Sequence, residues 1–563
     1  MKKINITILV ITAWLILPLS SCDDLDELNI SPNSPEVVSS NYILTYILTE
    51  TSKAYNRLGR EGENIPGAMQ YVQRGTDYGA LEVNSYEWNP DSWSTYYALL
   101  RNNDLINEKA VEDGNIFLEG VSLVMKSFLF GLTTDLFGDC PYSESLSAND
   151  GVYFPKYDEQ KDIYKGILED LKKASDLLAD VDVSINAIPA FADVIYQGDP
   201  IKWEKFANSL RLRYCLRLYN KSSEMNTIGM NIVTEFNDAV GNVIENDDDA
   251  AIMEFLGITA DNSNPGGPLA TANPTFGYKP CQTIIEKLTT LSDPRMHRWT
   301  NPVIRKWDLD GVVETEQTIT NIFGEVQTVT FVLPIAGNVL PIDSALYVGL
   351  PPGLAGSVAL VYNRGGDPAD YSSEKSPYIS NLSAIYRENA NDYVKVRLMT
   401  LSEVEFILAE ASVIGGFNVP LSAEQHYKNG IQASFDDYGV ENAIGGFDFD
   451  DYYSNPDVKL SDASDQQERI IEQKWISQWM GIESWFDWRR TGFPDLQTGP
   501  VAVYGNKLPL RFFYPSPNLD PKYLENYNEA VERLEATQNV PTGQTKDHSY
   551  SKMWLLQGTD KPW

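Results

Sequence analysis

The chain has 563 residues, 43% of them hydrophobic, and its 79 acidic side chains outnumber 44 basic ones to give a formal charge of −35. A charge of this sign repels nucleic acids and anionic lipids, so the composition excludes nucleic-acid partners and disfavours polyanionic ligands. The length alone would allow several domains, and the hydrophobic content is sufficient for a large core.

The first 21 residues predict a lipoprotein signal peptide. A short basic start precedes an apolar run over residues 6–19, which is shorter than the about 20 residues that a helix needs to cross a bilayer. A leucine, two serines and Cys22 follow, and this ending resembles a bacterial lipobox, in which the cysteine is lipidated and begins the mature chain. The alternative is a plain signal peptide followed by a chance cysteine. Residues 22–38 are predicted to be a tether, so the lipid would be the only membrane attachment.

Beyond the tether, apolar residues at helical spacing predict a mainly α-helical protein. The segment 118–130 is almost continuously apolar, which is typical of a largely buried helix. Several predicted helices come in adjacent pairs, as in helix-turn-helix repeat folds, although no strict period of about 34 residues is present. We expect helices at 42–55, 93–106, 118–130, 163–178, 200–219, 222–238, 281–290, 400–414, 421–437 and 464–487.

Long irregular stretches separate these helices. Residues 59–92, 256–280 and 334–390 are rich in glycine, asparagine, proline and aromatic residues. Loops of this length in a compact protein are usually functional or disordered, and the aromatic content favours ordered, functional loops. Residues 317–333 alternate in polarity around Gly324 and predict a small β-hairpin.

The sequence offers little material for metal or redox chemistry. With Cys22 lipidated, three cysteines remain without metal-binding spacing, and we expect small buried hydrophobes with at most one disulfide. Three widely separated histidines argue against a zinc site or a histidine-based triad. Residues 308–311 begin like a calcium loop but lack its other ligands, and 246–249 could hold calcium, yet we interpret both as turns. We therefore expect no cofactor, and calcium is an unsupported alternative.

A series of motifs follows in order along nearly the whole mature chain. They are WSTYY from Trp93, TDLFGDCPYSE from Thr134, PKYD from Pro155, GDPIKWEKFANSLRLR from Gly198, DPR from Asp293, AEA from Ala409, ESWFDWRRTG from Glu483, PLR from Pro509 and YP from Tyr514. Behind a lipobox, this set resembles the SusD/RagB family of outer-membrane nutrient-binding lipoproteins, in its second SusD-like branch.

The resemblance implies a single SusD-like domain over 39–563, built as a tetratricopeptide-like scaffold of helix pairs whose loops carry the ligand site. It implies binding without catalysis. Family members cap a SusC-like TonB-dependent transporter and pass it ligands, most often oligosaccharides. The acidic residues 23–27 also resemble the export signal of such lipoproteins, which implies an anchored protein on the outer face of the outer membrane.

Most of the motifs also have a structural interpretation. Gly138 would end a helix before Pro141. Trp203 would begin a buried helical face. Trp475, Trp479 and Glu483 fall at i, i+4 and i+8 of one predicted helix, which favours core packing over a ligand platform.

A sugar site needs flat aromatic platforms and planar polar side chains, because sugars present apolar C–H faces and rings of hydroxyls. The loops before Trp93, at 261–280 and near residue 347 offer this mixture. We therefore predict ligand contacts from Trp88, Tyr78, Arg74, Tyr86, Asn89, Asp91, Tyr71, Tyr278 and Tyr347. Trp88 is the first choice, and its alternative is a tryptophan that packs the loop onto the following helix.

Three functions remain open at this point. The first is an outer-membrane lipoprotein that binds a glycan, such as starch or another polysaccharide fragment, for its transporter. The second keeps that role with a peptide or other non-sugar cargo. The third is a lipid-anchored glycoside hydrolase with two carboxylates, which a chain with 79 acidic residues cannot exclude by composition.

Overall fold

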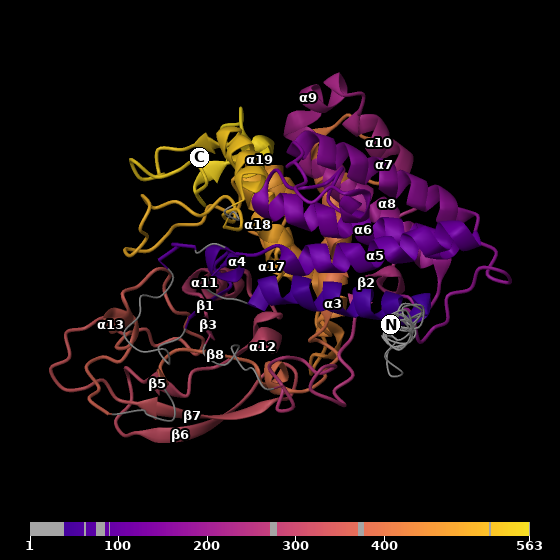
Figure 1. The fold of residues 1–563 in the computed structure, drawn as a ribbon. Helices are drawn as coiled ribbons and strands as arrows, with labels where there is room; N and C mark the ends of the chain where they lie inside the picture. The colour runs from indigo at the N-terminus through magenta and orange to yellow at the C-terminus, as the bar shows by residue number, and fades with distance from the viewer. Residues whose placement is uncertain are drawn as a thin grey trace, which may run out of the picture.

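Helices form most of the molecule, and several of the short strands lie together at its lower left in Figure 1, whereas β2 lies among the helices. The computed structural model describes residues 39–60, 64–74, 85–88, 91–270, 278–369, 376–516 and 520–561. The predicted signal peptide, the tether and Cys22 lie outside these residues, as do two of the predicted ligand residues, Tyr78 and Asn89.

In the first half of the chain, long helices pack one against the next. Local sequence sets where they begin: the side chain of Asn115 accepts the N–H of Leu118 at 3.0 Å, and Asp199 accepts the N–H of Ile201 at 2.9 Å. This consecutive pairing confirms the predicted helix-pair scaffold. The helices are α3 (Ser40–Arg60), α4 (Ile65–Ala68), α5 (Ser94–Asp113), α6 (Ile116–Phe137), α7 (Gln160–Ala179), α8 (Pro200–Arg217), α9 (Ser222–Thr227) and α10 (Ile232–Ala239).

Helix α6 is the core helix of this half, as its apolar sequence predicts. Among the described residues it is the one helix with the length and apolarity of a membrane span, and 83% of its apolar window is buried inside the fold. Gly138 ends it with a φ of 95°, a backbone conformation that side chains with a Cβ rarely adopt. The predicted end of the helix is therefore confirmed.

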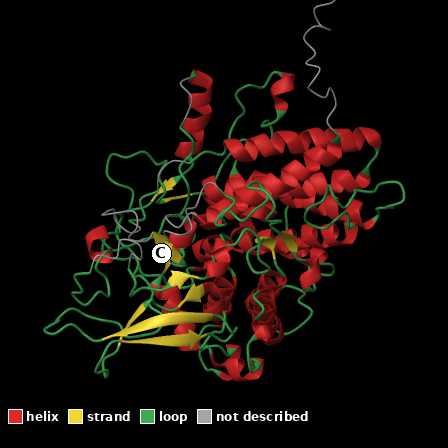
Figure 2. Ribbon diagram, turned by 90° about the horizontal axis from the view of Figure 1, so that it is seen from below, coloured by secondary structure: helices red, strands yellow, loops and turns green. Residues whose placement is uncertain are grey.

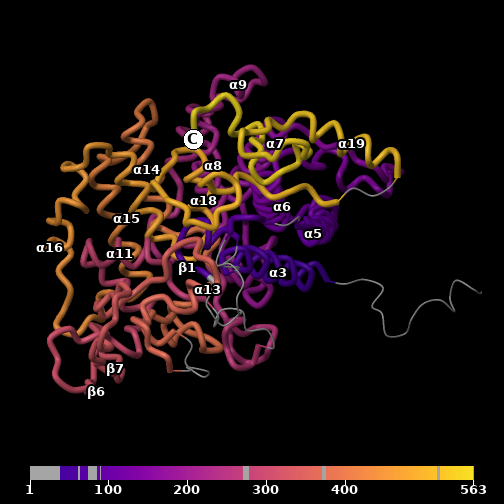
Figure 3. The backbone as a smooth tube through the Cα atoms, turned by 90° about the vertical axis from the view of Figure 1, so that its left-hand side faces the viewer, coloured from indigo at the N-terminus to yellow at the C-terminus, as the bar shows by residue number. Residues whose placement is uncertain are grey.

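Part of the second half of the chain, including α14 and α15, packs on the other side of α8, whereas α19 lies on the same side as α5, α6 and α7 (Figure 3). Figure 3 shows α14 and α15 on one side and α5, α6 and α7 on the other, with α8 and α18 between them, and α8 contacts α7, α14 and α18. The helices of this half are α11 (Gln282–Leu291), α12 (Met296–Trp299), α13 (Gly356–Ala359), α14 (Leu401–Ile414), α15 (Ala423–Asp437), α16 (Phe449–Ser454), α17 (Gln466–Ser477), α18 (Glu483–Thr491) and α19 (Pro521–Glu532).

The strands form small sheets that fasten loops to this helical body (Figure 2). The largest sheet has the order β5-β7-β6, and its β6–β7 hairpin turns at Gly324 with a φ of 82°, which confirms the predicted hairpin. The pairs are β1 (Val72–Arg74) with β3 (Tyr278–Pro280), β2 (Ala251–Met253) with β9 (Val396–Met399), β4 (Thr300–Asn301) with β8 (Asn381–Leu382), β5 (Arg305–Trp307) and β6 (Thr315–Thr320) with β7 (Val326–Val332), and β10 (Glu535–Ala536) with β11 (Ser551–Lys552).

Two predicted helices are each split in two. The helix predicted over 222–238 breaks between α9 and α10, because Gly229 has a φ of 83° and the side chain of Asn231 then accepts the N–H of Thr234 to begin a new helix.

Helix α19 is not among the helices predicted from the sequence.

The helix predicted over 464–487 also breaks, between α17 and α18. Met480 has a φ of 57°, and its carbonyl oxygen approaches α3 so closely that a Cβ added at Gly59 would lie 2.2 Å from it. Trp475 and Glu483 therefore belong to different helices, and the prediction that they share one helical face is wrong. A turn separates the two helices, although the helical spacing of apolar residues in the sequence continues through it.

Buried ion pairs join four helices at the centre of the body. Arg213 of α8 binds Glu403 of α14 with an Nη2–Oε2 distance of 2.7 Å. Arg217, one turn later, binds both Asp135 of α6 and Glu483 of α18. All five side chains are buried. The three of these residues that belong to the ordered motifs, Asp135, Arg213 and Glu483, therefore have structural roles.

The three cysteines of the described residues, Cys140, Cys215 and Cys281, are free and buried, as predicted for small hydrophobes. Burial raises the pKa of the Cys281 thiol to about 11, so this side chain is a poor nucleophile at neutral pH.

Candidate ligand-binding site

The predicted ligand residues fall into two groups in the structure. The first group surrounds the β1–β3 pair, in which Arg74 and Tyr278 are directly opposite partners. Gln73 fastens this pair to the loop that follows Tyr347, because its Nε2 donates to the Leu350 carbonyl at 2.7 Å. The three loops that hold predicted ligand residues of this group therefore lie beside one another in the structure.

The tyrosines of this group are committed to the core. The Tyr71 hydroxyl donates to the Trp475 carbonyl at 2.5 Å, and the two rings stack with centroids 5.6 Å apart. The Tyr347 hydroxyl lies 2.9 Å from Nδ1 of His297. Tyr71, Tyr278 and Tyr347 are all buried, which disfavours them as ligand platforms.

The second group lies against the C-terminal segment. The Trp88 ring is 4% exposed and packs 4.9 Å from Phe512 and 5.1 Å from Trp485, centroid to centroid. The Tyr86 carbonyl accepts a hydrogen bond from the Tyr550 hydroxyl at 3.0 Å. Trp88 therefore anchors its loop to α18 and the C-terminal segment. This burial disfavours our first choice of sugar platform.

Asp91 of the same group has a local role. Its Oδ1 accepts the N–H of Ser92 at 2.7 Å, immediately before α5 begins. The carboxylate therefore helps to order the chain that enters this helix.

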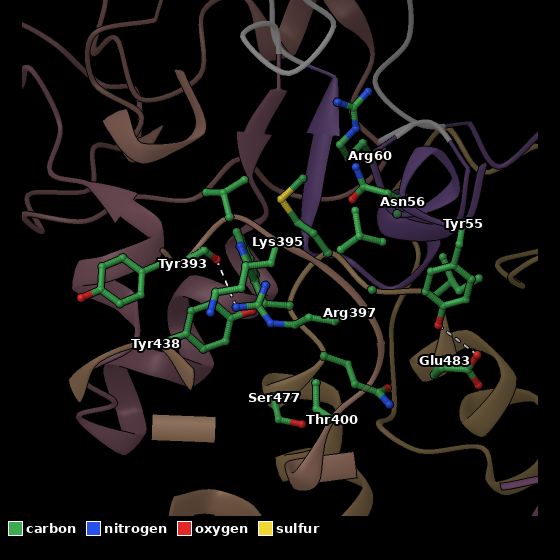
Figure 4. A pocket seen from close by; sticks show the side chains of 18 of the residues that line it. Tyr55, Asn56, Arg60, Tyr393, Lys395, Arg397, Thr400, Tyr438, Ser477 and Glu483 are labelled. Atoms are coloured by element: carbon green, nitrogen blue, oxygen red, sulfur yellow. Dashed lines mark hydrogen bonds between the residues drawn. The ribbon is translucent and has the colours of Figure 1, made fainter. Parts of the chain in front are cut away.

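A cavity of about 110 Å³ lies between α3, the segment 386–400 and the turn that separates α17 from α18. We call it the tyrosine cavity. Figure 4 shows Tyr393 and Tyr438 on one side of it and Asn56 and Arg60, from α3, on the other.

The aromatic wall of the tyrosine cavity is held in place by packing and hydrogen bonds. The Trp479 ring stacks on Trp299 with centroids 4.9 Å apart and an angle of 4° between the planes. Its Nε1 donates to the hydroxyl of Tyr386 at 2.8 Å, and both residues line the cavity. These contacts fix the positions of both rings before any ligand binds.

Tyr393, like Tyr386, is a half-buried aromatic residue of this cavity. The guanidinium of Arg298 lies 4.0 Å from its ring centroid, a cation–π contact that orients the ring. Arg397 donates to the Tyr393 carbonyl at 3.1 Å and pairs with Asp437, with a shortest Nε–Oδ2 distance of 2.5 Å. The position of Tyr393 is therefore fixed by two arginines.

Gln478 supplies the cavity with an unused amide. Its side-chain nitrogen and oxygen are both buried, and neither has a hydrogen-bond partner in the part of the chain that the structure describes. A buried polar group left unpaired costs about 1–3 kcal/mol. A ligand that brings a hydroxyl donor and acceptor to this amide would recover that cost.

The carboxylates of the cavity are already neutralised. Glu403 and Glu483 line it, and Arg213 reaches both. Burial acts to raise the pKa of Glu483, but the guanidinium groups of Arg213 and Arg217 outweigh it and hold the pKa below its ordinary value. A general acid in a two-carboxylate hydrolase needs the opposite shift. Glu483 is therefore not suited to act as that acid.

Metal binding has no support in the described residues, where no three histidine, cysteine, aspartate or glutamate side chains gather at a site suited to an ion.

Comparison with known proteins gives the family. The model of a family described as starch-binding and associating with the outer membrane, SusD-like_2, matches residues 32–315 and 355–515. The chain belongs to this SusD-like family. No curated protein matches it.

Solved structures share the SusD-like fold. A SusD homologue from Bacteroides fragilis is 24% identical, with a TM-score of 0.68, and the match covers 93% of this chain and 100% of that one. A second homologue from the same species is 22% identical, with a TM-score of 0.69 over 92% and 100%. A chitin-binding protein is 24% identical, with a TM-score of 0.67 over 92% and 99%.

Sequence reasoning missed the residues that line the tyrosine cavity of this SusD-like chain. Gln478 stands between Trp475 and Trp479, so an amide beside two tryptophans was a signal in the sequence. The signal was obscured because the pattern there predicted one continuous, buried helix. Asn56 and Tyr393 carry no comparable pattern.

Proposed function

We propose that this chain is a cell-surface lipoprotein that binds an oligosaccharide and delivers it to a SusC-like TonB-dependent outer-membrane transporter. The observation that carries the proposal is the tyrosine cavity, which combines fixed aromatic rings with the unpaired amide of Gln478 in a member of a starch-binding family. Aromatic rings suit the apolar faces of sugars, and amides suit their hydroxyls.

In this proposal Cys22 carries the lipid and residues 22–38 connect it to α3. A tether of this length spans at most about 55–60 Å when extended. It would therefore hold the binding module beside its transporter at a high effective concentration, which raises the chance of transfer without any new contact.

A variant at Gln478 tests the cavity. Gln478→Met keeps the side-chain length but removes the amide, so we expect affinity for the bound glycan to fall about ten-fold or more, because the loss of one or two buried hydrogen bonds costs about 1–3 kcal/mol. Stability should not fall, since the amide is unpaired in the unliganded fold. Isothermal titration calorimetry of the mature chain against a panel of neutral oligosaccharides measures the effect.

Gln317→Met is the matched control, because Gln317 is an exposed residue of β6, outside the cavity. Unchanged affinity in Gln478→Met would move the ligand away from the tyrosine cavity. Binding of peptides with no binding of any glycan would favour the peptide cargo, and turnover of a bound oligosaccharide would favour the hydrolase.

A further inference from the structure

Strand β6 is the exposed edge of the largest sheet. It is the outer strand in the order β5-β7-β6, and it lies at the lower edge of the molecule in Figure 1. Five of its six residues are exposed, and Ile319 is half-buried. The family model matches 32–315 and 355–515, so most of β6 and all of β7 lie outside the matched segments. The hairpin is therefore a feature of this chain beyond the matched family pattern.

Alternate residues of β6 direct their backbone hydrogen-bonding groups away from the sheet. Thr330 of β7 donates its N–H to the carbonyl of Ile304, just before β5, at 2.9 Å, so it faces β5 and not β6. Thr330 is also the register partner of Glu316. Because this direction alternates along a strand, the N–H and C=O groups of Glu316, Thr318 and Thr320 point outward.

Strand β6 lacks the devices that usually keep an edge strand from pairing. Such edges are commonly protected by lysine, proline, a β-bulge or a covering segment. The sequence of β6 is TEQTIT, without lysine or proline, and its register with β7 runs over all six residues without a bulge. Its threonines and isoleucine are β-branched residues, which favour strands. A further strand can therefore pair with this edge.

The edge is complementary to itself. A second copy related by a two-fold axis at Thr318 would place Thr318 opposite the same residue and Glu316 opposite Thr320, in an antiparallel pair. The outward groups of both copies would then form about six hydrogen bonds. Glu316 is the one charged residue of β6, and it faces threonine in both halves of the pair. A threonine pair across two strands is favourable, so no like charges oppose this register.

Exposed apolar side chains lie near both ends of the strand. Val312, shortly before β6, is 86% exposed, and Ile444 is 69% exposed. Ile444 lies against the hairpin turn, because a Cβ added at Gly324 would be 2.8 Å from its Cδ1 atom. Continued beyond the strand, the same register places Val312 opposite Gly324 of the second copy, and so beside Ile444. The pairing would bury apolar surface at each end.

We propose that β6 is a self-association surface, through which two copies of this chain pair as an antiparallel, two-fold dimer centred at Thr318. The contact is small, so we expect a weak dimer. The inference does not depend on the proposed glycan binding, because no residue of β6 lines the tyrosine cavity.

Sedimentation velocity of the mature chain tests the dimer. The weight-average mass should rise from that of one chain towards that of two between about 1 and 100 µM. Added salt should favour the dimer, because it screens the repulsion between two chains that each carry a formal charge of −35.

Charge variants at the two-fold axis test the register. Thr318→Lys and Thr318→Glu each bring like charges together at the axis, so each should weaken association at least about ten-fold. An equimolar mixture of the two variants should associate again, because lysine then faces glutamate. Thr328→Lys is the matched control, since Thr328 is the exposed register partner of Thr318 on β7, one strand away from the edge, and its variant should still dimerise.

Thermal unfolding of each variant, followed by circular dichroism, checks that the fold is intact. A mature chain that stays monomeric at the highest concentration and at high salt would overturn the inference. A dimer that persists in Thr318→Lys, or a charge-swapped mixture that fails to associate, would overturn it as well. None of these results bears on the glycan affinity, which titration calorimetry measures separately.

Discussion

Replacing Arg217 by methionine is expected to lower the free energy of unfolding by about 3–5 kcal/mol. Arg217 is buried in α8 and binds the carboxylates of Asp135 and Glu483, on two other helices. Its guanidinium also lies 4.7 Å from the ring centroid of Phe486. Methionine fills a similar volume but leaves two buried carboxylates with less positive charge beside them. A buried charge without a partner strongly destabilises the folded state.

Urea unfolding followed by circular dichroism measures this effect. The matched control is Arg101→Met, which removes an exposed arginine from α5 and should change stability by no more than about 0.5 kcal/mol. If Arg217→Met loses less than about 1 kcal/mol, the ion pairs of the four-helix junction do not hold the scaffold together.

Trp88→Ala is expected to destabilise the fold by about 3–5 kcal/mol, because it removes a buried ring that packs between Phe512 and Trp485. The folded fraction of this variant should retain its glycan affinity, since Trp88 does not line the tyrosine cavity. Trp88 as a sugar platform, the first choice from the sequence, predicts instead that this variant loses its glycan binding.

Two measurements on the same sample separate these outcomes. Urea unfolding gives the stability of Trp88→Ala, and calorimetric titration under native conditions gives its glycan affinity. Trp88→Phe keeps an aromatic ring in the same position and should recover part of the stability. A Trp88→Ala protein with normal stability and no glycan binding would restore Trp88 as a ligand platform.

Much of the fold could be predicted because its signals are local. The apolar run of α6, the polarity pattern around Gly324 and the caps at Asn115 and Asp199 act within a few residues of the structures they specify. The split between α17 and α18 could not be predicted in this way. It depends on the contact between Gly59 and the carbonyl of Met480, which are 421 positions apart in the sequence numbering.

The candidate site was harder to predict than the fold. Aromatic residues in loops serve equally well as ligand platforms and as anchors, and Trp88, Tyr71 and Tyr347 are buried in the structure. Tyr78 and Asn89 lie outside the described residues and stay predictions. Gln478 is a candidate because its amide has no hydrogen-bond partner among the described residues. That property depends on the turn between α17 and α18, so the sequence does not reveal it.

Co-purification from the outer membrane tests the central claim most directly. The full chain with a C-terminal tag would be expressed in its native cells, extracted with detergent and captured, and the proteins retained with it identified by mass spectrometry. The proposed function predicts a TonB-dependent β-barrel transporter in near-equal amount. Recovery of the tagged chain without any such transporter would contradict it.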